Sequence, residues 1–149
     1  MATALNLYDV FRKKQIQGSG SVDLTTLVVK IMLVTAAYTP NQNTHDFRDD
    51  LGATEVTGTN YAAKTLATVT STMDGSGNIT IDANDPSVFA QSASGFSNAR
   101  RAIVFIARGG AASADELVAY SNDFGADLGN VAADLTLTLS ASGLITSAR

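Results

Sequence analysis

The sequence predicts a mainly β protein, an antiparallel β-sandwich or jelly-roll-like fold that follows a short N-terminal amphipathic helix or arm. Three observations support this prediction. Residues 27–34 and 102–107 are nearly continuous apolar runs, which are typical of strands buried in a core. Several shorter segments alternate apolar and polar residues, as half-buried strands do. Turn residues separate these segments, and nothing in the pattern indicates the strand–helix alternation of a parallel sheet.

The N-terminal segment differs from the rest of the chain. Residues 4–17 are predicted to form a short amphipathic helix, because Leu5, Tyr8 and Phe11 follow near-helical spacing. The Gly-Ser stretch at residues 18–21 is expected to end this helix and to act as a flexible hinge. A helix this short is marginal alone, so we expect it to dock on its own domain or on a neighbour.

The predicted helix contains a basic cluster at residues 12–14, which is a dense positive patch in an otherwise acidic chain. It is either a solvated helix end, where basic residues favour the helix dipole, or a contact with an acidic partner surface. We therefore divide the chain into an arm at residues 1–20 and a single β-sandwich domain at residues 21–149. The predicted partner-binding residues of the arm are Tyr8, Phe11, Arg12, Lys13 and Lys14.

The strand predicted within residues 27–40 closes on a turn at Thr39, Pro40 and Asn41, and a polar loop follows up to residue 53. Residues 102–107 are expected to form a central strand of the core. A hairpin turn is predicted at residues 73–78, which are rich in residues that tolerate positive φ. Further short strands are predicted at residues 55–57, 61–71, 79–82, 117–120, 135–139 and 144–146.

The composition narrows the class of function. A net charge of −4 argues against a nucleic-acid-binding domain, whose surface is usually basic. The absence of cysteine excludes disulfides, zinc–thiolate sites and cysteine nucleophiles. The longest apolar run is far shorter than the roughly 20 residues of a membrane helix, and no signal peptide is visible, so we expect no membrane partner. Charged residues make up 16% of the chain, and small polar residues replace them, which suits packing into an assembly.

The sequence offers little for catalysis. His45 is the one histidine, it lies in a polar loop, and no G-x-S-x-G elbow presents a serine to it. We therefore predict no catalytic residue, no cofactor and no enzymatic activity. A small hydrolase or carbohydrate-binding module that uses His45 and the loop aspartates is kept as an alternative.

Aspartates gather in several predicted loops. Asp46, Asp49 and Asp50 supply oxygen ligands of the kind that hard cations prefer, and so do Asp74 and the pair at residues 82 and 85. None of these segments matches the spacing of an EF-hand loop. Aspartates also favour turns by accepting hydrogen bonds from nearby backbone N–H groups, so we predict no metal site and leave a cation at residues 46–50 open.

Three motifs resemble a known family. Residues 30–40 read K-x-M-L-V-T-x-A-Y-T-P with T-H-D-F-x-D-D at 44–50, residues 55–61 read E-V-x-G-T-x-Y, and residues 99–104 read A-R-x-A-x-V. With the segments around them, these motifs resemble small virion structural proteins of tailed bacteriophages over nearly the whole chain. The chain departs from the pattern at Ala62 and Ala63 and in the small residues at 109–114.

The resemblance implies a capsid decoration, or cement, protein. Such a protein sits on the capsid surface of the virion, is made in the cytoplasm of the bacterial host, and binds the major capsid protein and its own copies as a dimer or trimer. It bridges capsomers and so stabilises the shell. The alternative within the virion is a tail, head–tail connector or fibre-base component.

Overall fold

The computed structural model describes residues 2–3, 5–18 and 22–147. Their strands are β1 (Ala2–Thr3), β2 (Leu5–Leu7), β3 (Val29–Val34), β4 (Lys64–Thr65), β5 (Thr70–Met73), β6 (Ile79–Asp82), β7 (Arg101–Ile106), β8 (Leu117–Ser121), β9 (Thr138–Leu139) and β10 (Ile145–Ser147). The helices are α1 (Asp9–Gln17) and the 3-10 helices η1 (Arg48–Thr54) and η2 (Ala112–Ala114). The fold is mainly β with two antiparallel sheets, which confirms the predicted class. The jelly-roll arrangement stays a prediction.

The larger sheet has five strands in the order β2-β8-β7-β3-β4. Its centre is β7, which pairs with β3 over six residues, from Val29 opposite Ile106 to Val34 opposite Arg101. The prediction of a central strand at residues 102–107 is therefore confirmed. The predicted strand at 27–40 is shorter than expected, because the chain turns after Val34 and the Tyr38 N–H donates to the Thr35 carbonyl.

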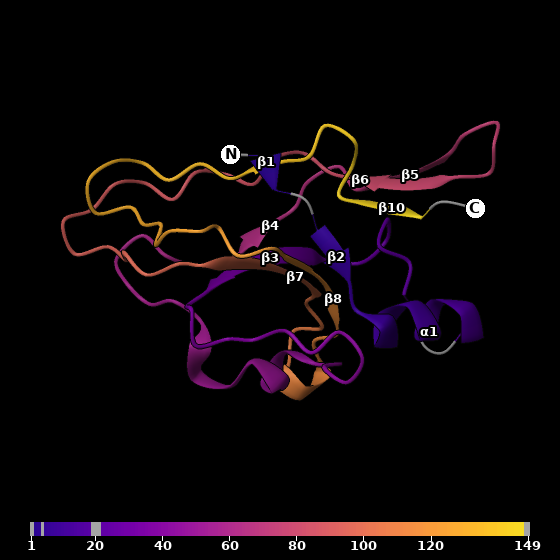
Figure 1. The fold of residues 1–149 in the computed structure, drawn as a ribbon, viewed down its shortest axis with the longest axis horizontal. Coiled ribbons are helices and arrows are strands. Elements are labelled where there is room, and N and C mark those ends of the chain that lie inside the picture. Colours follow the sequence, from indigo (N-terminus) through magenta and orange to yellow (C-terminus); the bar gives the residue numbers. More distant parts are fainter. Residues whose placement is uncertain (1, 4, 19–21, 148–149) are drawn as a thin grey trace.

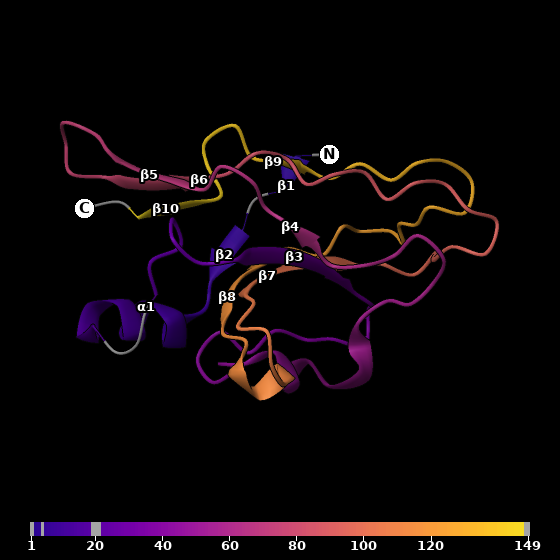
Figure 2. The same ribbon diagram turned by 180° about the vertical axis from the view of Figure 1, so that it is seen from behind.

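This sheet is covered on both faces (Figures 1 and 2). The smaller sheet, the pair β1–β9 and long connecting segments lie on one side, and η1, η2 and their loops lie on the other. The side chains of β3 and β7 are consequently buried on both faces: Ile31 and Leu33 on β3 and Ile103 and Val104 on β7 are fully inaccessible. Double coverage explains why both strands are continuous apolar runs instead of alternating ones.

The smaller sheet has three strands in the order β10-β6-β5 and is amphipathic. The registers place Ile79, Ile81, Ile145 and Met73 on one face, because residues opposite each other or two apart share a face. Threonines of all three strands occupy the other face. The predicted hairpin turn is confirmed, since the Asp74 carboxylate accepts hydrogen bonds from the N–H groups at residues 76 and 78.

The N-terminal segment differs from its prediction. The helix begins only at Asp9, and Leu5–Leu7 is an edge strand that pairs antiparallel with β8. Pairing with an exposed edge of the large sheet satisfies backbone groups that a helix end would leave open. The described part of residues 1–20 is thus built into the domain and is not a separate arm. Gly18 ends the helix with φ of 62°, as predicted, while residues 19–21 of the predicted hinge lie outside the described residues.

Several other predicted strands are shorter or irregular. The segment at 55–57 contributes a single bridge, between Glu55 and Val34. The strand predicted at 61–71 is divided into β4 and β5, and Thr68 between them has φ of 54°, which an extended strand cannot adopt. Of residues 135–139, only the last two form a regular strand, which pairs with β1 in parallel. Over the described residues, no helix is long and apolar enough to cross a membrane.

Candidate functional site: an apolar groove beside α1

Helix α1 is fastened to the body of the protein at its start and along one face. The Tyr8 N–H donates to the Val118 carbonyl at 3.1 Å, and Phe11 is 1% exposed. Lys14 Nζ lies 2.5 Å from Asp46 Oδ1 and 4.2 Å from the centre of the Phe47 ring. These contacts fix which side of the helix faces solvent.

The predicted partner-binding residues therefore divide into two groups. Tyr8 and Phe11 are buried in the protein's own core, so for them a partner contact is corrected to a role in packing. Lys14 forms an ion pair with Asp46. Arg12 and Lys13 remain at the surface, and the Arg12 side chain is 58% exposed and lies 3.8 Å from Asp9.

An apolar groove lies between α1 and the three-stranded sheet. It has a volume of about 320 Å³. Arg12 and Gln15 provide its polar rim, and a second hollow of about 310 Å³ shares Arg12 with it. The apolar lining of the groove comes from β2, α1, β6 and β10, and consists of Leu7, Ile16, Ile79, Ile81 and Ile145.

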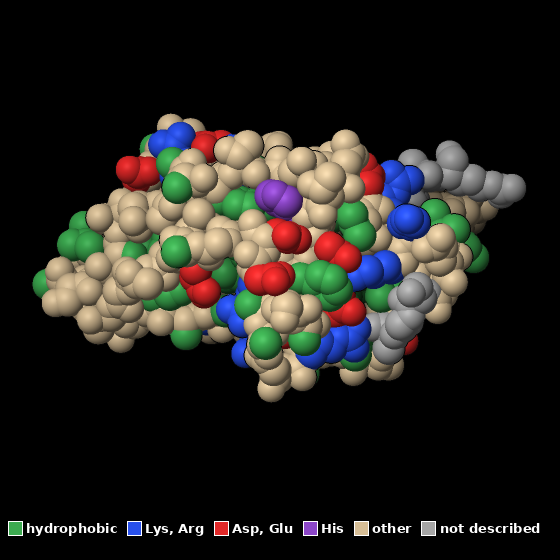
Figure 3. Space-filling model, turned by 90° about the horizontal axis from the view of Figure 1, so that it is seen from below, with side chains coloured by type: hydrophobic (Ala, Val, Ile, Leu, Met, Phe, Trp, Pro, Cys, Tyr) green, Lys and Arg blue, Asp and Glu red, His purple; other side chains and the backbone are tan. Residues whose placement is uncertain are grey.

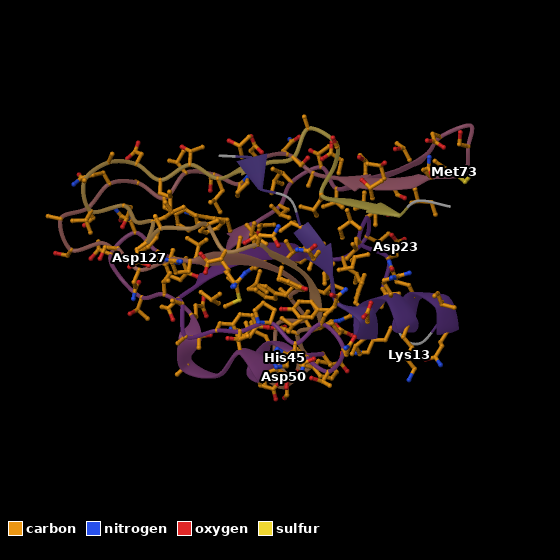
Figure 4. All side chains as sticks on the ribbon, in the orientation of Figure 1. Lys13, Asp23, His45, Asp50, Met73 and Asp127 are labelled. Carbon is orange, nitrogen blue, oxygen red and sulfur yellow. The ribbon has the colours of Figure 1, made fainter. Side chains whose placement is uncertain are left out.

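Part of this lining is strongly exposed. Ile16 is 83% exposed and Ile79 is 43% exposed, and Met73 at the end of β5 is 72% exposed on the same face of the sheet. Figure 4 shows Lys13 and Met73 at the same end of the molecule. Exposed apolar side chains that gather beside a groove are typical of an interaction surface. With Arg12 and Lys13 next to it, this surface suits an apolar segment that also carries acidic groups.

His45 takes part in a chain of hydrogen bonds with two tyrosines. The Tyr8 and Tyr38 hydroxyls lie 2.6 Å apart, and the Tyr38 hydroxyl lies 2.8 Å from His45 Nδ1. The Asn41 N–H also donates to Nδ1, so Nδ1 is an acceptor, Tyr38 donates to it, and Tyr8 donates to Tyr38. Burial raises the pKa of Tyr8 and raises the pKa of Tyr38 to about 12, so both hydroxyls keep their protons. This arrangement fastens the loop at 41–45 to the start of α1.

The acidic loop beside His45 also has structural partners. Figure 3 shows the histidine with acidic side chains gathered next to it. Asp46 pairs with Lys14, and Asp50 Oδ2 accepts the N–H groups of Asp46 and Phe47 at 2.7 and 3.1 Å. Within the described ranges, no group of three His, Cys, Asp or Glu residues is arranged to hold a metal ion. Asp50 thus acts as the turn-forming residue that its sequence context favours, whereas the Asp46 carboxylate pairs with Lys14.

Comparison with known proteins finds no relative: no protein-family model matches the chain, and neither does any curated protein or solved structure.

The groove was not predicted from the sequence. One signal was present, because Ile16 is an isolated apolar residue in the polar end of the helix. The remaining lining comes from strands far apart in the chain, which only the fold brings together.

Proposed function

We propose that this chain is a structural virion protein of a tailed bacteriophage that binds the outside of the capsid and stabilises it by bridging capsomers. Two arguments support the proposal: the sequence resemblance over nearly the whole chain, and the groove beside α1. The groove is the structural observation on which the proposal depends. A protein that leaves Ile16 and Ile79 exposed beside a groove has apolar surface still to bury on a partner.

The proposed partner surface belongs to the major capsid protein. The capsid protein would place an apolar segment in the groove and acidic groups near Arg12 and Lys13, which are exposed on α1. A protein that binds only the assembled shell stabilises that shell by mass action, and the effect multiplies over many copies. Charged groups at such a rim mainly set the association rate and its salt dependence.

The experiment is a pelleting assay with capsids that lack this protein. Ile16→Gln removes the most exposed apolar side chain of the groove and keeps a good helix former in α1. Burial of an isoleucine contributes about 1.5–3 kcal/mol, so we expect binding to weaken by about one to two orders of magnitude. Val88→Gln is the matched control, because Val88 is 44% exposed and does not line the groove. Unchanged binding of the Ile16→Gln protein would overturn the assignment of the groove.

The charge reversal Arg12→Glu with Lys13→Glu tests the acidic partner. We expect weaker pelleting at low salt and a smaller difference from the wild type at high salt, because salt screens exposed charges. An equal loss at every salt concentration would contradict an electrostatic role for these two residues.

A tail, head–tail connector or fibre-base position is the second candidate within the virion. Copy number separates the two. Decoration requires copies in numbers comparable to the major capsid protein, whereas a tail or connector component is present in few copies per particle. Densitometry of purified virions measures this ratio directly. Loss of a hydrolytic activity on His45→Ala would instead favour the enzymatic alternative.

A further inference from the structure

Strand β5 is an exposed edge of the smaller sheet. It is the outer strand of the order β10-β6-β5, and all four of its residues are exposed. Natural edge strands are usually shielded by a charged residue, a proline, a bulge or very short length. The edge strand β4 of the larger sheet is two residues long and carries Lys64. By contrast, β5 reads Thr-Ser-Thr-Met and pairs with β6 without a register shift.

The hydrogen-bond pattern fixes which backbone groups of β5 face outward. The Asp74 N–H donates to the Asn78 carbonyl, so that pair is hydrogen-bonded. Hydrogen-bonded and non-hydrogen-bonded pairs alternate along an antiparallel ladder. Counting back from Asp74, Thr72 and Thr70 bond to β6, while the N–H and C=O groups of Ser71 and Met73 point away from it. The bond from the Leu144 N–H to the Ile81 carbonyl agrees, since it turns the backbone opposite Ser71 toward β10.

We infer that β5 pairs antiparallel with β5 of a second copy of this chain, about a twofold axis at Thr72. In this register Ser71 lies opposite Met73 of the partner copy, and Met73 lies opposite the partner's Ser71. These two pairs form four backbone hydrogen bonds and use every outward group of the strand. The two small sheets become one sheet of six strands.

The side chains are compatible with this twofold arrangement. Thr70 lies opposite Asp74 of the other copy, so no like charges meet across the axis. Both Met73 side chains fall on the same face, because a shift by an even number of residues preserves the faces of a strand. The apolar face formed by Ile79 and Met73 therefore continues from one copy into the other. A second copy fits this edge because the strand is complementary to itself, as an isologous contact requires.

The contact deepens the proposed function, since it assigns a surface to the expected association between copies, and it rests on that function for the expectation that copies meet. A strand of four residues buries less than the roughly 800 Å² per partner of a standard stable interface. Attachment of neighbouring copies to one shell raises their effective concentration and favours pairing there. The free protein is expected to dimerise only at high concentration.

Single cysteines test the register in a chain that contains none. Residues at a non-hydrogen-bonded antiparallel pair have Cα atoms about 4.5 Å apart, within the range of a disulfide, so Thr72→Cys on the axis is expected to cross-link two copies under mild oxidation. Thr70→Cys is the matched control: it is an exposed threonine on the same face of the same strand. The two copies of residue 70 lie four residues apart along the pair, about 13 Å, which is too far.

We expect the Thr72→Cys protein to form covalent dimer at least about tenfold faster than the Thr70→Cys protein at high concentration, because pairing raises the local thiol concentration. Adding Met73→Lys to Thr72→Cys should reduce the rate to that of the control, since lysine protects an edge. Equal rates for both cysteines would overturn the inference. So would slow cross-linking at residue 72 combined with lost capsid binding by Met73→Lys, because the edge would then accept a capsid strand. Because the cross-linking assay contains no capsid, its result does not depend on whether the proposed function is correct.

Discussion

The five-stranded and three-stranded sheets of this protein are both antiparallel, but they differ in burial. In the five-stranded sheet, Ile31, Leu33 and Ile103 are fully inaccessible to solvent. In the three-stranded sheet, all residues of β5 are exposed, and Ile79 on β6 is 43% exposed. The first sheet is covered on both faces, whereas part of the apolar face of the second borders a groove. The large sheet therefore holds the buried core of the domain, whereas the small sheet leaves apolar side chains exposed to solvent.

A small sheet with an uncovered apolar face gains little stability by itself. Three strands need a hydrophobic face packed on something to be stable alone, and here the opposing wall is α1 with Ile16 at 83% exposure. The anchored side of the sheet is β10, where Ile145 is 6% exposed, and exposure rises across β6 toward Met73. Substitutions should therefore cost less the farther they lie from the large sheet.

The largest expected difference is between two isoleucines. Ile103→Ala opens a cavity in the middle of β7 and should lower the free energy of unfolding by about 2–5 kcal/mol. Ile79→Ala removes a side chain that is 43% exposed and should cost less than about 1 kcal/mol. Urea denaturation of both variants measures the contrast. Similar losses would mean that the small sheet is as much a part of the core as the large one.

A second test asks whether the loops that cover the large sheet belong to the stable region. Asn130 is fully buried, and its side chain accepts the Phe96 N–H at 2.8 Å and donates to the carbonyls of Ala90 and Thr59 at 2.7 and 3.2 Å. Asn130→Ala leaves these groups without a partner, at about 1–3 kcal/mol for a buried group, so we expect a loss of about 3 kcal/mol.

Asn6→Ala is the control for this variant. The Asn6 side chain donates to the Asn122 side chain at 3.1 Å in an exposed position, so its loss should stay within about 0.5 kcal/mol. Thermal or urea unfolding of both proteins gives the comparison. If Asn130→Ala lowered the free energy of unfolding as little as Asn6→Ala does, the covering loops would contribute little to the stability of the large sheet.

Local sequence signals predicted the regular part of the fold. The apolar runs of β3 and β7 and the turn at Asp74 were recognisable because their burial and hydrogen bonding follow from neighbouring residues. Leu5–Leu7 was wrongly expected to be helical, because its strand conformation depends on pairing with β8, more than 100 residues later. The segments tied by Asn130 lack periodicity altogether, so no local pattern could reveal them.

The candidate site was predicted in part. Arg12 and Lys13 are exposed as a partner contact requires, while Tyr8 and Phe11 have the same helical spacing but pack inward. Spacing identifies a shared face of a helix and does not say whether that face meets the core or a partner. The groove could not be found from the sequence, since it joins Ile16 to strands about 60 and 130 residues farther along the chain.

The buried tyrosines predict that the protein loses stability at alkaline pH. Burial raises the pKa of Tyr38 from 10.0 to about 12. Its contribution to stability is complete below pH 10 and is lost as the pH rises toward 12, because the unfolded chain releases this proton first. The steepest part of that window costs at most about 1.4 kcal/mol per pH unit. Tyr8 and Tyr61, whose pKa values burial also raises, act in the same direction.

The Tyr38→Phe protein isolates this contribution. Its stability should fall by about 1 kcal/mol less than that of the wild type between pH 10 and pH 11, because the unfolded tyrosine is already half ionised at pH 10. Urea unfolding at the two pH values, with tyrosinate absorbance to follow ionisation, provides the measurement. Parallel loss in both proteins would show that Tyr38 ionises as freely in the folded protein as in the unfolded chain.

The smallest expected effect on stability is at the groove itself. Ile16→Gln and Met73→Lys change side chains that are 83% and 72% exposed, so the free energy of unfolding should change by less than about 0.5 kcal/mol. Glutamine also has a helix propensity at least equal to that of isoleucine. Urea unfolding at neutral pH checks both variants. A loss of 2 kcal/mol or more, on the order of a core cavity, would place these residues in the core. A near-zero change together with weakened binding would separate the partner surface from the stable body.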